Sequence, residues 1–167
     1  MGSGTNWAKS ATGGSAGAYK AIISVTRKVD ATLVVGAGGI SYGFEGGPHM
    51  TVSGSGTPGE DSIIYFNGEE MISAGGGKGG NASSHTGGDG GIVIISDTLN
   101  VEQEYIHKNG TKGNSINGAG GVSGVPGPIS GHTWGSSSSA SGSYGGGSSG
   151  PSKNGYILIK YLGPLED

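Results

Sequence analysis

Residues 62–73 read SIIYFNGEEMIS, and this stretch carries the strongest short-range structural signal in the chain. Two apolar runs flank the pair Asn67-Gly68. A tight type I′ hairpin turn needs positive φ at both central residues, which Asn and Gly tolerate best. The stretch therefore predicts two antiparallel strands joined by a two-residue turn.

Other short apolar runs predict further strands. Ala21, Ile23 and Val25 alternate with polar residues, which is typical of a half-buried strand. Residues 31–35 form a second short run, and residues 99–107 are a further candidate.

The runs at 92–95 and 156–162 are apolar at nearly every position, so they predict central strands that are covered on both faces. Helix signals are nearly absent, because glycine costs ~1 kcal/mol relative to alanine in a helix interior. Residues 101–108 are the least unfavourable stretch for a helix.

Glycine-rich segments separate the predicted strands, at 36–59, 75–91 and 110–155. In the last of them glycine recurs at every third position, at Gly118, Gly121, Gly124 and Gly127. Three residues per turn is the period of a polyproline II helix, whose N–H and C=O groups point sideways and can pair with neighbouring segments. Collagen has the same period, but four triplets are too few for it. Residues 136–149 are Ser/Gly-rich and fit a flexible loop equally well.

The predicted fold is therefore mainly β, with short antiparallel strands, stacked glycine-rich polyproline-II-like (polyglycine II) segments and almost no helix. We expect one glycine-rich domain over residues 1–167. Within it, residues 1–109 are rich in strands, and residues 110–167 combine glycine/serine-rich loops with a C-terminal strand.

Composition narrows the functional classes. The 167 residues include 40 glycines and no cysteine, the hydrophobic share is 32%, and the formal net charge is −3. No basic stripe is present, which argues against a nucleic-acid partner. No apolar run approaches the ~20 residues that span a bilayer, so we expect no membrane insertion. The lack of cysteine rules out disulfides and thiolate metal sites.

Motifs that suggest catalysis are better explained as structure. Residues 33–39, LVVGAGG, resemble a dinucleotide-binding loop, but the glycines and Pro48 that follow prevent the helix which that loop needs. Residues 13–17, GGSAG, match the nucleophile-elbow pattern without its strand and helix. Asp89, within GGDGG, most simply marks a turn, although it could contact a cation. We therefore expect no enzyme activity, no metal and no cofactor.

Aromatic residues inside the glycine segments are the candidate binding residues. The candidates are Tyr42, Phe44, His132, Trp134 and Tyr144. Exposed aromatics on rigid loops commonly bind sugars and protein surfaces. The alternative is that each ring packs over neighbouring glycine backbone.

Several pieces of the chain, in order, resemble the glycine-rich domains of bacteriophage tail fibres and tail-tip adhesins of the T-even-like type. They are AYKAIISV (18–25), ATLVVGAGG (31–39), SAGGGKGG (73–80), GDGGIVII (88–95) and SGPSKNGYILIKY (149–161). The resemblance runs from about residue 13 to residue 163. It implies a virion protein at a fibre tip, in which glycine helices stack in a sandwich and loops contact the host receptor. The glycine runs of this chain are shorter, and its strands more prominent, than in that family.

Three functional hypotheses follow. The first is a virion adhesin that binds a bacterial surface polysaccharide or outer-membrane protein. Its further partners would be other virion fibre proteins and copies of itself, with a trimer as the favoured homo-oligomer. The second is a structural fibre or decoration subunit, which unpaired edges at 92–95 and 156–162 would favour. The third is an ice-binding protein, which would need a regular, flat face.

Overall fold

The computed structural model describes residues 9–11, 13–40, 56–81, 84, 86–113, 115–117 and 154–164. This part of the chain contains eight short strands and no helix, and so no helix that could cross a membrane. The strands are β1 (Lys9–Ala11), β2 (Ala18–Ile23), β3 (Ala31–Val34), β4 (Ser62–Phe66), β5 (Glu69–Ala74), β6 (Val93–Ile95), β7 (Val101–Lys108) and β8 (Ser115–Asn117). The mainly β, antiparallel fold predicted from the sequence is confirmed.

The β4–β5 hairpin forms where the Asn-Gly pair predicts it. Asn67 has a φ of 51° and Gly68 a φ of 83°, so both central residues adopt the left-handed conformation of a type I′ turn. Ile64 pairs with Ile72, and the register shifts between Ile64 and Tyr65.

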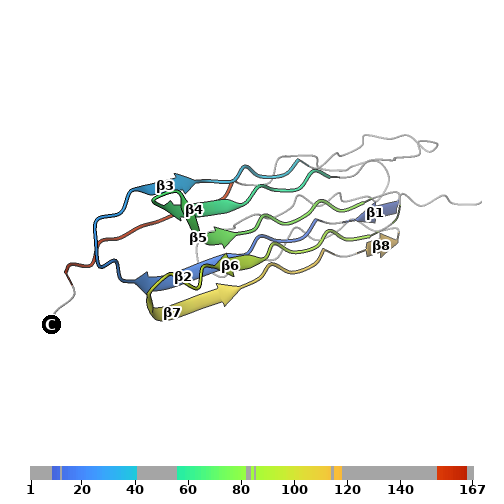
Figure 1. The fold of residues 1–167 in the computed structure, drawn as a ribbon. Helices are drawn as coiled ribbons and strands as arrows, with labels where there is room; N and C mark the ends of the chain where they lie inside the picture. The colour runs from blue at the N-terminus through green and yellow to red at the C-terminus, as the bar shows by residue number, and fades with distance from the viewer. Residues whose placement is uncertain are drawn as a thin grey trace, which may run out of the picture.

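Strands β3, β4, β5 and β6 form one antiparallel sheet in that order. β2 pairs with β7, and β1 pairs with β8, in two further antiparallel pairs. Figure 1 shows β2 to β7 gathered at one end of an elongated body, with β1 and β8 at the other. The sequence offered residues 99–107 as a strand and residues 101–108 as the least unfavourable helix. The structure has a strand there, β7.

The run predicted at 92–95 forms a strand, β6, but its predicted central position is wrong, and the strand predicted at 156–162 is wrong altogether. β6 ends the four-stranded sheet, and its exposure alternates, with Val93 6% exposed and Ile94 58% exposed. Residues 156–162 form no strand, and Leu158 within them is 74% exposed. Both runs are apolar at nearly every position, which predicted burial of all their side chains. Among the described residues, however, nothing covers the side chains of Ile94 or Leu158.

Backbone hydrogen bonds continue from the strands into the glycine segments with a different period. Along one pair of segments the N–H groups of Gly75, Lys78 and Asn81 donate to the carbonyls of Ile92, Asp89 and Thr86, respectively. A β-ladder returns to the same neighbour every second residue, whereas these bonds return every third. Three is the period predicted for polyproline-II-like segments. Their assignment as polyglycine II helices stays a prediction.

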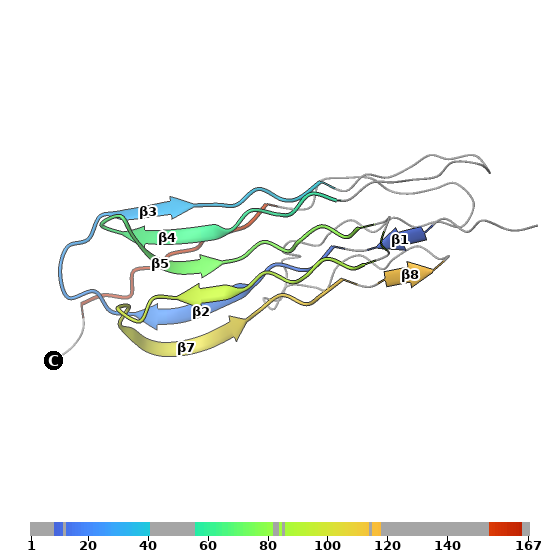
Figure 2. The same ribbon diagram turned by 45° about the vertical axis from the view of Figure 1, so that its right-hand side comes forward.

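Segment 13–17 shows that the glycine segments pack in more than one plane. Its N–H groups donate to carbonyls of Lys78 and Gly75 on one neighbour and of Thr111 on a second. Its Ser15 carbonyl accepts from Gly91 on a third neighbour. A strand in a single sheet has only two hydrogen-bonded neighbours, so these segments form a bundle, as the two views in Figures 1 and 2 suggest.

Glycine is required where these backbones meet. A Cβ on Gly91 would lie within 3.0 Å of the Gly75 carbonyl oxygen, and a Cβ on Gly110 would lie equally close to that of Ser15. Only Met71, Ile72 and Val93 are buried hydrophobic residues among those described. The interior of this part of the molecule is therefore built largely from hydrogen-bonded backbone.

Candidate functional site

All five predicted binding residues lie outside the residues that the structure describes. They are Tyr42, Phe44, His132, Trp134 and Tyr144. Their role in binding therefore stays a prediction. The described residue nearest to Tyr42 in the sequence is Ile40, which ends the segment that follows β3.

The glycine segments run away from strands β3 to β6 toward the opposite end of the body (Figure 2). We call this opposite end the distal end. Hydrogen bonds place the segment ends side by side there: Thr57 donates to the Ile40 carbonyl, Gly56 donates to that of Gly80, and Asn81 pairs with Thr86. The chain enters and leaves the undescribed stretch 41–55 at this end.

A shallow depression lies at the distal end, between the segments that contain Asn81 and Asp89. Its polar lining consists of Lys78, Asn81, Ser84, Thr86, Asp89 and Lys112, together with the backbone of Gly79, Gly87 and Gly88. We refer to it as the distal depression. It brings together residues from three separate segments of the chain.

Local hydrogen bonds shape one wall of the distal depression. The Asn81 Oδ1 atom accepts from the Ser84 backbone N–H at 3.0 Å, and Ser84 Oγ donates to Thr86 Oγ1 at 3.1 Å. The Asn81–Thr86 backbone pair closes the turn in both directions, with N···O distances of 2.9 and 3.1 Å. An Asn side chain that bonds nearby backbone is typical of tight turns.

An ion pair forms the other wall. Lys112 Nζ lies 3.1 Å from Asp89 Oδ1, and both side chains are well exposed, at 60% and 63%. The positive charge beside Asp89 is therefore the ammonium group of Lys112. Below these side chains, the Lys78 N–H donates to the Asp89 carbonyl and the Gly113 N–H donates to that of Gly88, which fixes the backbone of both walls.

The chemistry of the distal depression suits a polar ligand. It offers hydroxyl, amide, carboxylate and ammonium groups on backbone that is hydrogen-bonded to its neighbours. Such groups can donate to and accept from the hydroxyls of a sugar. The described residues contain no cluster of three or more His, Asp or Glu that could hold a metal ion.

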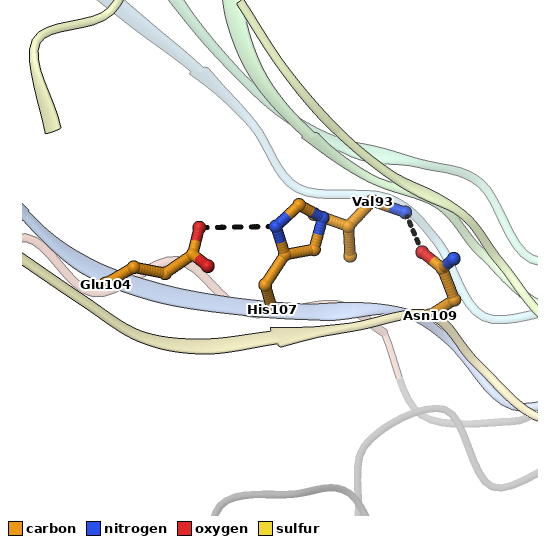
Figure 3. A network of polar contacts seen from close by, with 4 residues as sticks. All are labelled: Val93, Glu104, His107 and Asn109. Atoms are coloured by element: carbon orange, nitrogen blue, oxygen red, sulfur yellow. Dashed lines mark hydrogen bonds and ion pairs between the residues drawn. The ribbon is translucent and has the colours of Figure 1, made fainter.

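A second polar cluster lies at the strand end of the molecule. His107 Nδ1 lies 3.2 Å from Glu104 Oε2, and Asn109 Oδ1 accepts from the Val93 N–H at 2.8 Å. Figure 3 draws both contacts as dashed lines. The Tyr19 ring meets His107 edge-on, with centroids 5.6 Å apart. Burial, and then the negative charge of Glu104, raise the pKa of the Tyr19 hydroxyl.

These strand-end contacts join β2, β6 and β7, and none of their residues lines the distal depression, so we assign them a structural role. Ser24 supports the same reading, since its Oγ donates to Glu102 Oε1 at 2.6 Å and ties the chain after β2 to β7.

Sequence reasoning missed the distal depression. Of its lining, only Asp89 carried a signal, through the GGDGG pattern. Lys112 lies far from Asp89 in the sequence and in no motif. The two segments are brought together by backbone bonds from the Gly113 N–H to the Gly88 carbonyl and from the Gly110 N–H to the Gly91 carbonyl.

No protein-family model, curated protein or solved structure matches this chain.

Proposed function

We propose that this protein is an adhesin at the tip of a bacteriophage tail fibre, and that its distal end binds a polysaccharide of the bacterial surface. The observation that carries the proposal is the distal depression, a set of sugar-compatible polar groups on hydrogen-bonded backbone. The virion context rests on the ordered resemblance of the sequence to glycine-rich tail-fibre domains.

Rigidity is what the glycine scaffold contributes to binding. Segments 75–81 and 86–92 are bonded to each other at three successive points, and each is also bonded to segment 13–17. A site on such backbone is preorganised, so little conformational entropy is lost when a ligand binds. The segments that end at Ile40 and begin at Gly56 meet near this site, and Tyr42 and Phe44 of the stretch between them remain candidate binding residues.

The test is binding of labelled protein to a broad panel of bacterial strains and to polysaccharide purified from any strain that binds. Asp89→Asn removes the charge that pairs with Lys112 while keeping the shape of the side chain. We expect this variant, and Trp134→Ala separately, to weaken binding by about tenfold or more.

Glu70→Gln is the matched control, because Glu70 is an exposed carboxylate in β5 at the strand end. It should bind like the parent protein. Binding that survives Asp89→Asn, or that falls equally in Glu70→Gln, would contradict a receptor site at the distal depression.

A structural fibre subunit is the second candidate. It is favoured by the exposed apolar residues at 158–162, which form no strand, and by the position of β6 at the end of its sheet. The second hypothesis named unpaired strand edges at 92–95 and 156–162 as features in its favour, and of these two stretches only 93–95 is a strand. Failure to bind any strain or polysaccharide, together with assembly of the purified protein into long polymers, would favour this function over the first.

A further inference from the structure

The C-terminal segment 157–162 has the composition of a strand but is not one. It reads ILIKYL, and Leu158, Ile159, Tyr161 and Leu162 are 74%, 57%, 81% and 64% exposed. Its backbone makes no hydrogen bond within the part of the chain that the structure describes. Contiguous apolar surface of this kind on a soluble protein commonly marks an interaction site.

β3 offers a matching edge. It ends the four-stranded sheet, its one partner among the described strands is β4, and all four of its residues are exposed. Leu33 is 46% exposed, Val34 42%, and Val35, just beyond the strand, 51%. An exposed apolar edge strand presents unpaired N–H and C=O groups that can accept another strand.

Segment 157–162 does not fill this edge within its own chain, although it begins close to it. The Gly155 N–H donates to the Gly36 carbonyl at 2.8 Å, and Asn154 Oδ1 accepts from the Gly38 N–H at 2.9 Å. These bonds hold the start of the segment beside the residues that follow β3. Beyond them the segment runs away from β3 in both views (Figures 1 and 2).

We propose that residues 157–162 of one copy of this protein add as an antiparallel strand to β3 of a second copy. Each chain carries both halves of the pairing, a donor segment and an edge strand, so copies of the chain can pair with each other without another protein. Strand addition of this kind gains main-chain hydrogen bonds and covers apolar side chains on both partners.

Charge favours the antiparallel direction. Asp30 directly precedes β3 and is exposed, and Lys160 lies in the second half of the donor segment and is also exposed. An antiparallel alignment brings the later donor residues to the start of β3, so that Lys160 lies beside Asp30. A parallel alignment would place Lys160 near the other end of the edge.

The surface used differs from the distal depression. β3 lies at the strand end of the body, and the segments that line the depression run to the opposite end (Figure 2). Assembly through β3 therefore leaves the proposed receptor site open, and the inference does not depend on which ligand that site binds.

The experiment measures the mass of the 167-residue protein by sedimentation and light scattering over a range of concentrations. We expect the parent protein to associate. Leu158→Lys in the donor and Leu33→Lys in the edge should each raise the dissociation constant by roughly tenfold or more, because a charge on an edge or donor strand opposes pairing. A 1:1 mixture of the two variants retains one intact donor and one intact edge and should recover a two-chain complex.

Ile94→Lys is the matched control, since Ile94 is 58% exposed on β6, at the opposite edge of the same sheet. It should associate like the parent, and circular dichroism should show that all three variants keep the parent fold. A parent protein that is monomeric at every concentration would overturn the inference, as would association that neither Leu158→Lys nor Leu33→Lys weakens. A mixture that stays monomeric would also overturn it.

Discussion

At the scale of single residues, the glycines of this protein differ in what they do. Gly76 and Gly59 lie on neighbouring segments and illustrate the difference. A Cβ on Gly76 would lie within 3.0 Å of the Gly59 carbonyl oxygen, whereas a Cβ on Gly59 would meet its nearest atom, the Ala37 carbonyl oxygen, at an ordinary 3.6 Å. Neither glycine has a positive φ, so contact distance separates them.

Gly76→Ala is therefore expected to lower the free energy of unfolding by about 2–3 kcal/mol, because one backbone must move away from the other. Gly59→Ala should be neutral or stabilising by up to about 1 kcal/mol, because alanine restricts the unfolded chain. Chemical denaturation of both variants checks this. Equal destabilisation by the two substitutions would contradict a backbone-packed interior.

The buried hydroxyl of Tyr19 leads to a second prediction at the residue scale, on the pH dependence of stability. Its hydroxyl is shielded from solvent, and its pKa is raised by burial and by the neighbouring Glu104 carboxylate. The folded state therefore holds the hydroxyl proton more tightly than the unfolded state. The resulting contribution to stability is complete below the unfolded pKa of about 10, and it is lost as the pH rises through the folded pKa.

Tyr19→Phe should remove this pH dependence. Near neutral pH the substitution should change stability by no more than about 1 kcal/mol, because the cost of burying the hydroxyl offsets most of what its contact with Glu104 contributes. Above about pH 10 the parent protein should lose stability more steeply than the variant. Thermal unfolding of both proteins from pH 7 to pH 11 measures the difference, and parallel curves would show that Tyr19 does not titrate differently on folding.

At the scale of elements, side-chain oxygens link strands that share no ladder. β6 pairs with β5 on one side, and on the other side Asn109, just after β7, accepts from the Val93 N–H. Val93 is only 6% exposed, so loss of this acceptor leaves a buried donor unsatisfied.

Asn109→Ala should cost about 1–3 kcal/mol of unfolding free energy for that reason. Asn109→Asp keeps the acceptor oxygen and should retain most of the stability. Hydrogen exchange at the Val93 amide gives a local readout, and we expect faster exchange in the alanine variant alone. Slow exchange in Asn109→Ala would mean that another group satisfies this N–H.

At the scale of the whole molecule, a backbone interior should change the thermodynamics of unfolding. Hydrogen bonds between glycine segments replace most of the apolar contacts of an ordinary core, and few hydrophobic side chains are buried among the described residues. The heat capacity of unfolding arises mainly from newly exposed apolar surface.

We therefore expect calorimetry to give a heat-capacity change well below the roughly 2–2.5 kcal/mol/K typical of 167 residues. The measurement should be made on the Leu158→Lys variant, so that dissociation of copies does not add to the signal. A value in the ordinary range would indicate a large apolar core.

The strands that the sequence predicted correctly are those with local signals. The Asn67-Gly68 turn and its flanking apolar runs interact over a few residues, so the β4–β5 hairpin could be predicted without knowing the rest of the chain. β2 and β3 followed from short apolar patterns in the same way.

Tertiary structure decided which segments are neighbours. Every glycine offers the same N–H and C=O groups, so nothing in the sequence indicates that Gly110 pairs with Gly91 or Gly17 with Gly75. The distal depression depends on this choice, because it places Lys112 beside Asp89. Of the apolar runs at 92–95 and 156–162, only Val93 is buried as predicted. A side chain is buried only where another segment packs over it, and composition does not indicate where that segment lies. Local propensity and turn chemistry thus determined the strands, whereas non-local pairing of chemically identical backbone determined the packing and the candidate site.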